Sequence, residues 1–194
     1  ISVLGERRVK IRDRVENLAA DRSPLMLVYH CNPGFPLLDR GTRLMIHSDK
    51  STEWLHDKEV SPADYALAKG PQQKAHDDVY VHRPLSDRQG QVHVGLLNDK
   101  LGLGLYWKFK RSEIPIVNHW QHFHKGTYVT GIEPGNCSVL GRAWNRKHKT
   151  LQYIEPGEVR EFNIEIGVLD GQREMQTFER RVNQGITEGK KRRQ

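Results

Sequence analysis

Two ionisable residues follow apolar segments and precede runs of proline, glycine and asparagine. His30 follows "PLMLVY" and precedes "CNPGFP", and Glu133 follows "YVTGI" and precedes "PGN". Turn residues of this kind end strands, so both side chains would be fixed at the end of a sheet. An imidazole and a carboxylate form a workable general acid and general base at neutral pH. The two segments together therefore favour proton-transfer chemistry, and the alternative for each is an ordinary turn residue.

The stretch "NHWQHFH" suggests a different chemistry. His122 and His124 are two residues apart, which places both on one face of a strand. Zinc or iron would need a third ligand, often a carboxylate, and the carboxylate considered is Glu133. In a cupin site the glutamate follows His-x-His after only a few residues, and a further histidine follows on the next strand. This spacing fails, so we expect no metal.

The other histidines carry no distinguishing neighbours. They lie in predicted strands or polar loops, where a histidine is typically exposed or packed. This group comprises His47, His56, His76, His82, His93 and His148.

The elements that would position these residues are strands, because the dominant hydrophobic period is two. Segments such as "VKIRDRV", "DDVYVHRPL" and "EVREFNIEIGVLDG" alternate or run apolar, and turn signals such as "DRQG" and "EPGE" separate them. This pattern predicts an all-β protein, an antiparallel β-sandwich or barrel. Helix is expected only near residues 62–68 and 174–182.

The bulk composition narrows the function classes. A chain of 194 residues is long enough for one domain. The net charge of +7 includes four charges in the final "KKRR", so the rest is only mildly basic, and we expect no nucleic-acid partner. No apolar run is long enough for a membrane helix. The two cysteines, Cys31 and Cys137, fit no zinc spacing, and we expect reduced thiols, no disulfide and a cytoplasmic location.

Three segments carry a family resemblance. "RVENLAADRSPLMLVYHCNPGFPLLD", "GTYVTGIEPGNCSVLGR" and "EPGEVREFNIEIGVLDG" resemble a little-characterised branch of the aldose 1-epimerase (galactose mutarotase)-like family. The resemblance runs from about Arg8 to Gly171 and implies a galactose mutarotase-like supersandwich that binds a sugar. Family members have many further strands upstream, so we expect the C-terminal portion of a longer protein, with a sugar-binding sandwich at 1–172 and a helical basic tail at 173–194.

The resemblance also implies roles for single residues. His30 would be the general acid at the sugar ring oxygen, and Glu133 the general base at the anomeric hydroxyl. Their side chains are expected to face one cleft, several ångströms apart and not hydrogen-bonded. Asp77 would hold sugar hydroxyls on the wall of that cleft. The remaining expected contacts to the sugar are Trp120, Phe35, Gln121 and Asn32, where Gln121 replaces a basic residue expected in this branch.

The leading hypothesis is an isomerase that interconverts the anomers of a sugar or sugar derivative without metal or cofactor. The alternative is a sugar-binding protein of the same fold without turnover, and a cupin-like metal enzyme is a more distant one. Anomer-exchange NMR would distinguish the isomerase from the non-catalytic sugar-binding protein, and metal analysis would distinguish the cupin-like enzyme from both. Assembly into a homo-oligomer remains open.

Overall fold

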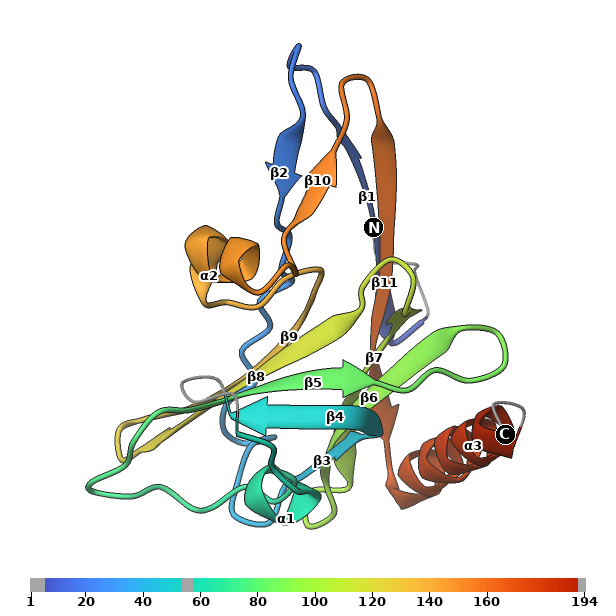
Figure 1. The fold of residues 1–194 in the computed structure, drawn as a ribbon. Coiled ribbons are helices and arrows are strands. Elements are labelled where there is room, and N and C mark those ends of the chain that lie inside the picture. Colours follow the sequence, from blue (N-terminus) through green and yellow to red (C-terminus); the bar gives the residue numbers. More distant parts are fainter. Residues whose placement is uncertain (1–5, 54–57, 192–194) are drawn as a thin grey trace.

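The computed structural model describes residues 6–53 and 58–191, and its strands form antiparallel sheets (Figure 1). In chain order the strands are β1 (Arg8–Glu16), β2 (Ser23–Leu25), β3 (Arg43–Ile46), β4 (Ser48–Glu53), β5 (Asp78–Pro84), β6 (Gln91–Asn98), β7 (Leu103–Lys110), β8 (Ile116–His124), β9 (Thr127–Gly135), β10 (Gln152–Ile154) and β11 (Val159–Asp170). The helices are α1 (Pro62–Tyr65), α2 (Gly141–Lys147) and α3 (Gln172–Lys191).

The strands form two main sheets, which we name by their size. The five-stranded sheet has the order β1-β11-β7-β6-β3, and the four-stranded sheet has the order β4-β5-β8-β9. The chain passes from one sheet to the other between β3 and β4, where His47 alone separates the two strands. A two-stranded pair, β10-β2, belongs to neither main sheet and lies beside the upper ends of β1 and β11 in Figure 1. The predicted antiparallel sandwich is confirmed.

The core lies between the two main sheets. Alternating positions of β6, among them Val92 and Val94, point inward and contact apolar residues of the opposite sheet, such as Val117 and Ile132. Trp107 at the centre of β7 is fully buried in the same cluster. This inward alternation is the period of two that the sequence displays.

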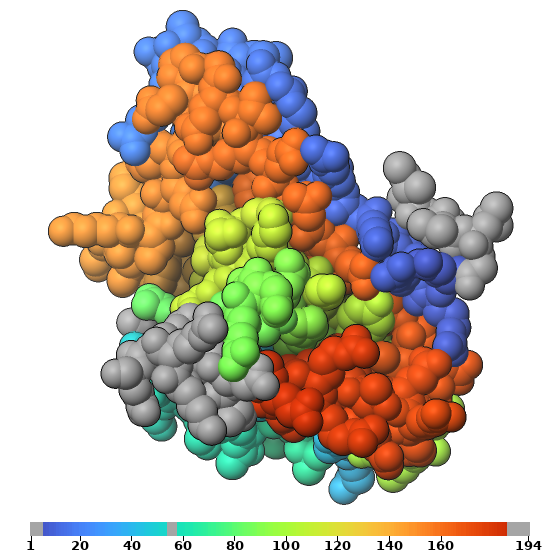
Figure 2. All heavy atoms as spheres, turned by 90° about the vertical axis from the view of Figure 1, so that its right-hand side faces the viewer, coloured from blue at the N-terminus to red at the C-terminus, as the bar shows by residue number. Residues whose placement is uncertain are grey.

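Helix α3 packs on the outer face of the five-stranded sheet. Met175 is buried against Leu97 and Leu169, and Phe178 lies over Gly95, where a side chain would leave no room for its ring. Figure 2 shows α3 flat against the body of the protein, with the turn between β5 and β6 beside it. The helix therefore adds a third layer on this side.

Some elements of the fold carry no clear signal in the sequence. Helix α2 was not predicted. It begins at Gly141, whose φ of 86° suits glycine, and Asn145 fixes it locally by donating to the Ser138 and Gly141 carbonyls. Strand β4 was missed because "SDKSTE" is polar. The apolar run "PLMLVYH" is mostly not a regular strand: only its first two residues belong to β2. Within the described residues, no helix is long and apolar enough to cross a membrane.

Candidate functional site

His30 is positioned by the free edge of the four-stranded sheet. Single bridges join Val28 to Gly135, Cys31 to Ile132 and Gly34 to Val129. All three bridges share one antiparallel register, in which residue 30 stands opposite residue 133. Backbone hydrogen bonds support this register, including Tyr29 N–H to Pro134 O at 2.8 Å. The segment 28–34 therefore follows β9 as an irregular edge and carries His30 to the side of Glu133.

The two side chains are in direct contact. His30 Nε2 lies 3.0 Å from Glu133 Oε1. The expectation of several ångströms without a hydrogen bond is therefore wrong for this structure, because opposite positions of neighbouring antiparallel segments bring side chains close together. The imidazole is 53% exposed and the carboxylate only 4%. Burial raises the pKa of Glu133 above its ordinary value, and the facing imidazole partly offsets this by lowering it.

Trp120 lies beside this pair on the same face of the sheet. In the β8–β9 register Asn118 is opposite Glu133 and Trp120 is opposite Gly131, so these four positions share one face. The Glu133 carboxylate extends along β9 over Gly131, next to the Trp120 side chain. The pair His30–Glu133 therefore has an aromatic neighbour.

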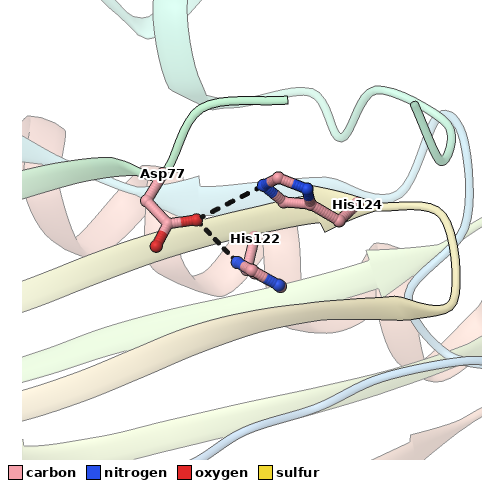
Figure 3. Close-up of side chains that lie close together, drawn as sticks. All are labelled: Asp77, His122 and His124. Carbon is pink, nitrogen blue, oxygen red and sulfur yellow. Dashed lines mark hydrogen bonds and ion pairs between the residues drawn. The ribbon is translucent and has the colours of Figure 1, made fainter. Parts of the chain in front are cut away.

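Further along the same face, Asp77 meets two histidines of β8 (Figure 3). Asp77 Oδ1 lies 2.6 Å from His122 Nδ1 and 3.8 Å from His124 Nε2. The two imidazole rings stack with their centroids 4.4 Å apart. The other nitrogen of His122, Nε2, lies 2.9 Å from Thr127 Oγ1. We call Asp77, His122 and His124 the Asp–His cluster.

The Asp–His cluster and the pair His30–Glu133 are separate groups. Glu133 is opposite Asn118, and His122 lies four residues further along β8. At about 3.4 Å per residue, the two groups are roughly 14 Å apart along the strand. Trp120 lies between them, and its ring centroid is 5.2 Å from that of His122. One sheet face therefore carries two sets of polar side chains.

The other three predicted sugar contacts, Asn32, Phe35 and Gln121, do not all lie on the face that carries His30 and Glu133. Asn32 is exposed two residues after His30, so by alternation it faces the same side. Phe35 is 76% exposed, so it does not pack in the core. Gln121 does not join the site, because it points to the opposite face of β8; there it is buried and donates a hydrogen bond from Nε2 to the Tyr65 carbonyl at 2.9 Å.

A cavity of about 390 Å³ lies outside the predicted site. Its walls come from β4, β5, the segment after β9 and α2, and neither His30 nor Glu133 lines it. Lys50, Arg83 and Arg111 give its wall a basic character, and Arg111 is paired with Asp49 at 2.9 Å. Sequence analysis missed this cavity because its wall includes the unpredicted β4 and α2.

Two histidines are buried on the core side of the four-stranded sheet. His82 and His119 lie with ring centroids 5.7 Å apart, between Tyr65 and Tyr80. Burial lowers the pKa of His119 to about 3, and it lowers the pKa of His82 well below its ordinary value. Both rings are therefore neutral at physiological pH, and His82 Nδ1 pairs with Ser51 Oγ at 2.8 Å.

The fold matches several solved structures, among them proteins described as aldose 1-epimerase or galactose mutarotase-like. A "putative aldose 1-epimerase" from Klebsiella pneumoniae superposes with a TM-score of 0.87 at 22% identity, over 95% of this chain and 48% of that one. A galactose mutarotase-like protein from Clostridium acetobutylicum gives a TM-score of 0.55 at 14% identity, over 83% of this chain and 52% of that one. The architecture is therefore a galactose mutarotase-like sandwich, and the chain spans about half the length of these structures.

The sequence places the chain more narrowly. It belongs to the family described as a domain of unknown function, DUF4432, whose model matches residues 1–168. No curated protein matches it by sequence.

Proposed function

We propose that this chain carries the acid–base pair of a sugar-binding isomerase that interconverts anomers. The observation that carries the proposal is the 3.0 Å contact between His30 Nε2 and Glu133 Oε1 on one face of a mutarotase-like sheet. The fold supports the substrate class, since solved proteins of this architecture include proteins described as aldose 1-epimerases.

The two residues suit complementary proton transfers. The Glu133 carboxylate accepts the proton of the anomeric hydroxyl while His30 donates a proton to the ring oxygen, and the C1–O bond to the ring breaks. After the aldehyde rotates, the same two transfers run in reverse and close the ring as the other anomer. Burial raises the pKa of Glu133 and makes its carboxylate a stronger base.

The environments of the pair fit these roles. Glu133 is fixed in a regular strand and almost fully buried, whereas His30 is half exposed on an irregular edge segment. A bound sugar would replace the direct contact between them, and the exposed imidazole can move aside and exchange protons with water. Trp120 would contact the apolar face of the sugar ring, and Asn32 would bind a hydroxyl group.

Saturation-transfer NMR on a panel of aldoses tests the proposal. Glu133→Gln keeps the shape of the side chain but removes the base, so anomer exchange should fall by about 10²–10⁴-fold while sugar binding persists. His30→Asn should lower the exchange rate by a similar factor. In the double variant, the increase in activation free energy should be smaller than the sum of the two single increases. Glu161→Gln, an exposed change in the other main sheet, is the matched control. Equal exchange rates for wild type and Glu133→Gln would remove Glu133 from the mechanism.

A non-catalytic sugar-binding protein is the second candidate. The direct contact between His30 and Glu133 also fits this candidate, because each side chain fills the space in which the other would contact a reacting substrate atom. Sugar binding without any exchange in the same NMR experiment would support this candidate.

A further inference from the structure

We propose that the Asp–His cluster binds a divalent first-row transition-metal ion through Asp77 Oδ1, His122 Nδ1 and His124 Nε2. The inference goes beyond the proposed isomerase, whose proton transfers need no metal. It concerns a separate group of side chains on the same sheet face (Figure 3).

The ligand types suit such an ion. Two imidazoles and one carboxylate are a common donor set for zinc and non-haem iron, and imidazole also binds copper and nickel well. The three residues leave further coordination positions for water or a ligand. The cluster is accessible enough for this: the exposed fractions of the side chains are 23% for His122, 34% for His124 and 51% for Asp77.

The geometry is close to that of a metal site. Each of the three residues offers one ligand atom, and these atoms lie within 4.8 Å of one another. Ligands about 2.1 Å from a tetrahedral zinc ion are roughly 3.4 Å apart. The 3.8 Å between Asp77 Oδ1 and His124 Nε2 is near this value, and the 2.6 Å between Asp77 Oδ1 and His122 Nδ1 must lengthen. Small rotations of partly exposed side chains achieve both changes.

Thr127 can orient His122 in both states. In the neutral imidazole without metal, Nδ1–H of His122 donates to the Asp77 carboxylate, which accepts only, and Nε2 then accepts from the Thr127 hydroxyl. With metal, Nδ1 is the ligand, the proton resides on Nε2, and the same hydroxyl accepts from it. Metal-ligating histidines ordinarily have such a partner on the second nitrogen.

The arrangement of the two rings also favours a shared ion. His122 alone satisfies Asp77 with a short hydrogen bond, yet His124 Nε2 also faces the same oxygen at a distance too long for one. One carboxylate oxygen therefore faces two stacked imidazoles. The strand alternation holds both rings there, since His122 and His124 are two residues apart on β8.

Metal titration of the chelator-treated protein tests the proposal. We expect one equivalent of Co²⁺ to give d–d absorption bands of a nitrogen- and oxygen-ligated ion, and one equivalent of Zn²⁺ to bind in calorimetry. Asp77→Asn and His124→Asn should abolish the Co²⁺ bands. Thr127→Val should weaken affinity by about 10–100-fold by removing the partner of His122.

Asp78→Asn is the matched control, because Asp78 is the adjacent carboxylate on the other side of β5 and should leave binding unchanged. Circular dichroism of each metal-free variant checks that it is folded. Absence of Co²⁺ and Zn²⁺ binding to the wild-type protein would overturn the proposal. Equal binding by folded Asp77→Asn and Asp78→Asn would also overturn it, since the ion would then lie elsewhere.

Discussion

The carboxylate of Glu133 occupies the space above Gly131 that any larger residue at position 131 would fill. Gly131→Ala should therefore push the carboxylate away from the position in which it contacts His30. A misplacement of about 1 Å can cost roughly 10²-fold in rate. We expect a loss of this size in anomer exchange, measured by saturation-transfer NMR.

Gly34→Ala is the control for this substitution. Gly34 lies on the neighbouring edge segment, and an added methyl group there would make an ordinary contact of 3.4 Å with the Tyr128 carbonyl. Its exchange rate should match that of the wild type. If Gly131→Ala exchanged anomers at the wild-type rate, the carboxylate would not need its position over Gly131.

The raised pKa of Glu133 predicts a pH-dependent stability difference. The folded protein holds this proton more tightly than the unfolded chain, so the free energy of unfolding falls as the pH rises through the raised pKa. Glu133→Gln has no titrating carboxyl group at this position, so its free energy of unfolding lacks this decrease with pH. The thermal midpoint of the variant, relative to that of the wild type, should therefore be higher at pH 7 than at pH 4. A difference that stays constant over this range would contradict a raised pKa.

The buried histidines predict loss of stability in acid. Below pH 6.5 the unfolded chain binds protons at His119 and His82 that the folded protein excludes, down to a pKa of about 3 for His119. The free energy of unfolding should therefore fall as the pH drops through this range. His119→Phe, which keeps an aromatic ring beside Tyr65 and Tyr80, should lose less stability than the wild type between pH 7 and pH 5. Parallel melting curves for the two proteins would refute this.

The packing of α3 predicts a large effect from one buried methionine. Met175 is 1% exposed against Leu97 and Leu169, so Met175→Ala should lower the free energy of unfolding by about 2–5 kcal/mol. Gln176→Ala, one position further on the exposed side, should change it by less than about 0.5 kcal/mol. Chemical denaturation measures both values. Similar small effects would mean that α3 contributes little to stability.

The antiparallel sandwich could be predicted because its signal is local. Alternation along strands such as β11 and the turn residues between strands act within a few residues. The polar strand β4 carries no such signal, since its pairing with β5 decides its conformation. The contact of His30 with Glu133 was likewise hidden, because it depends on the register of an irregular edge segment.

The Asp–His cluster shows the same limit. The pair His122 and His124 was visible from spacing, but the carboxylate was sought at Glu133, which follows in the chain. The partner in the structure is Asp77, 45 residues before His122, brought there by the pairing of β5 with β8. Strand alternation predicted that Asp77 and Asp78 face opposite sides of the sheet, and the structure has Asp77 beside His122 and Asp78 opposite Gln121. Which strands become neighbours is a property of the whole sheet.

The edge segment 28–34 allows His30 and Glu133 to change independently in evolution. Glu133 belongs to a strand with a full ladder to β8, so a change in its backbone would disturb the sheet. His30 depends on three single bridges. An insertion or deletion in this segment could move or replace the imidazole while the carboxylate keeps its place. The position of the proposed proton donor can therefore change independently of that of the proposed base, at little cost in folding.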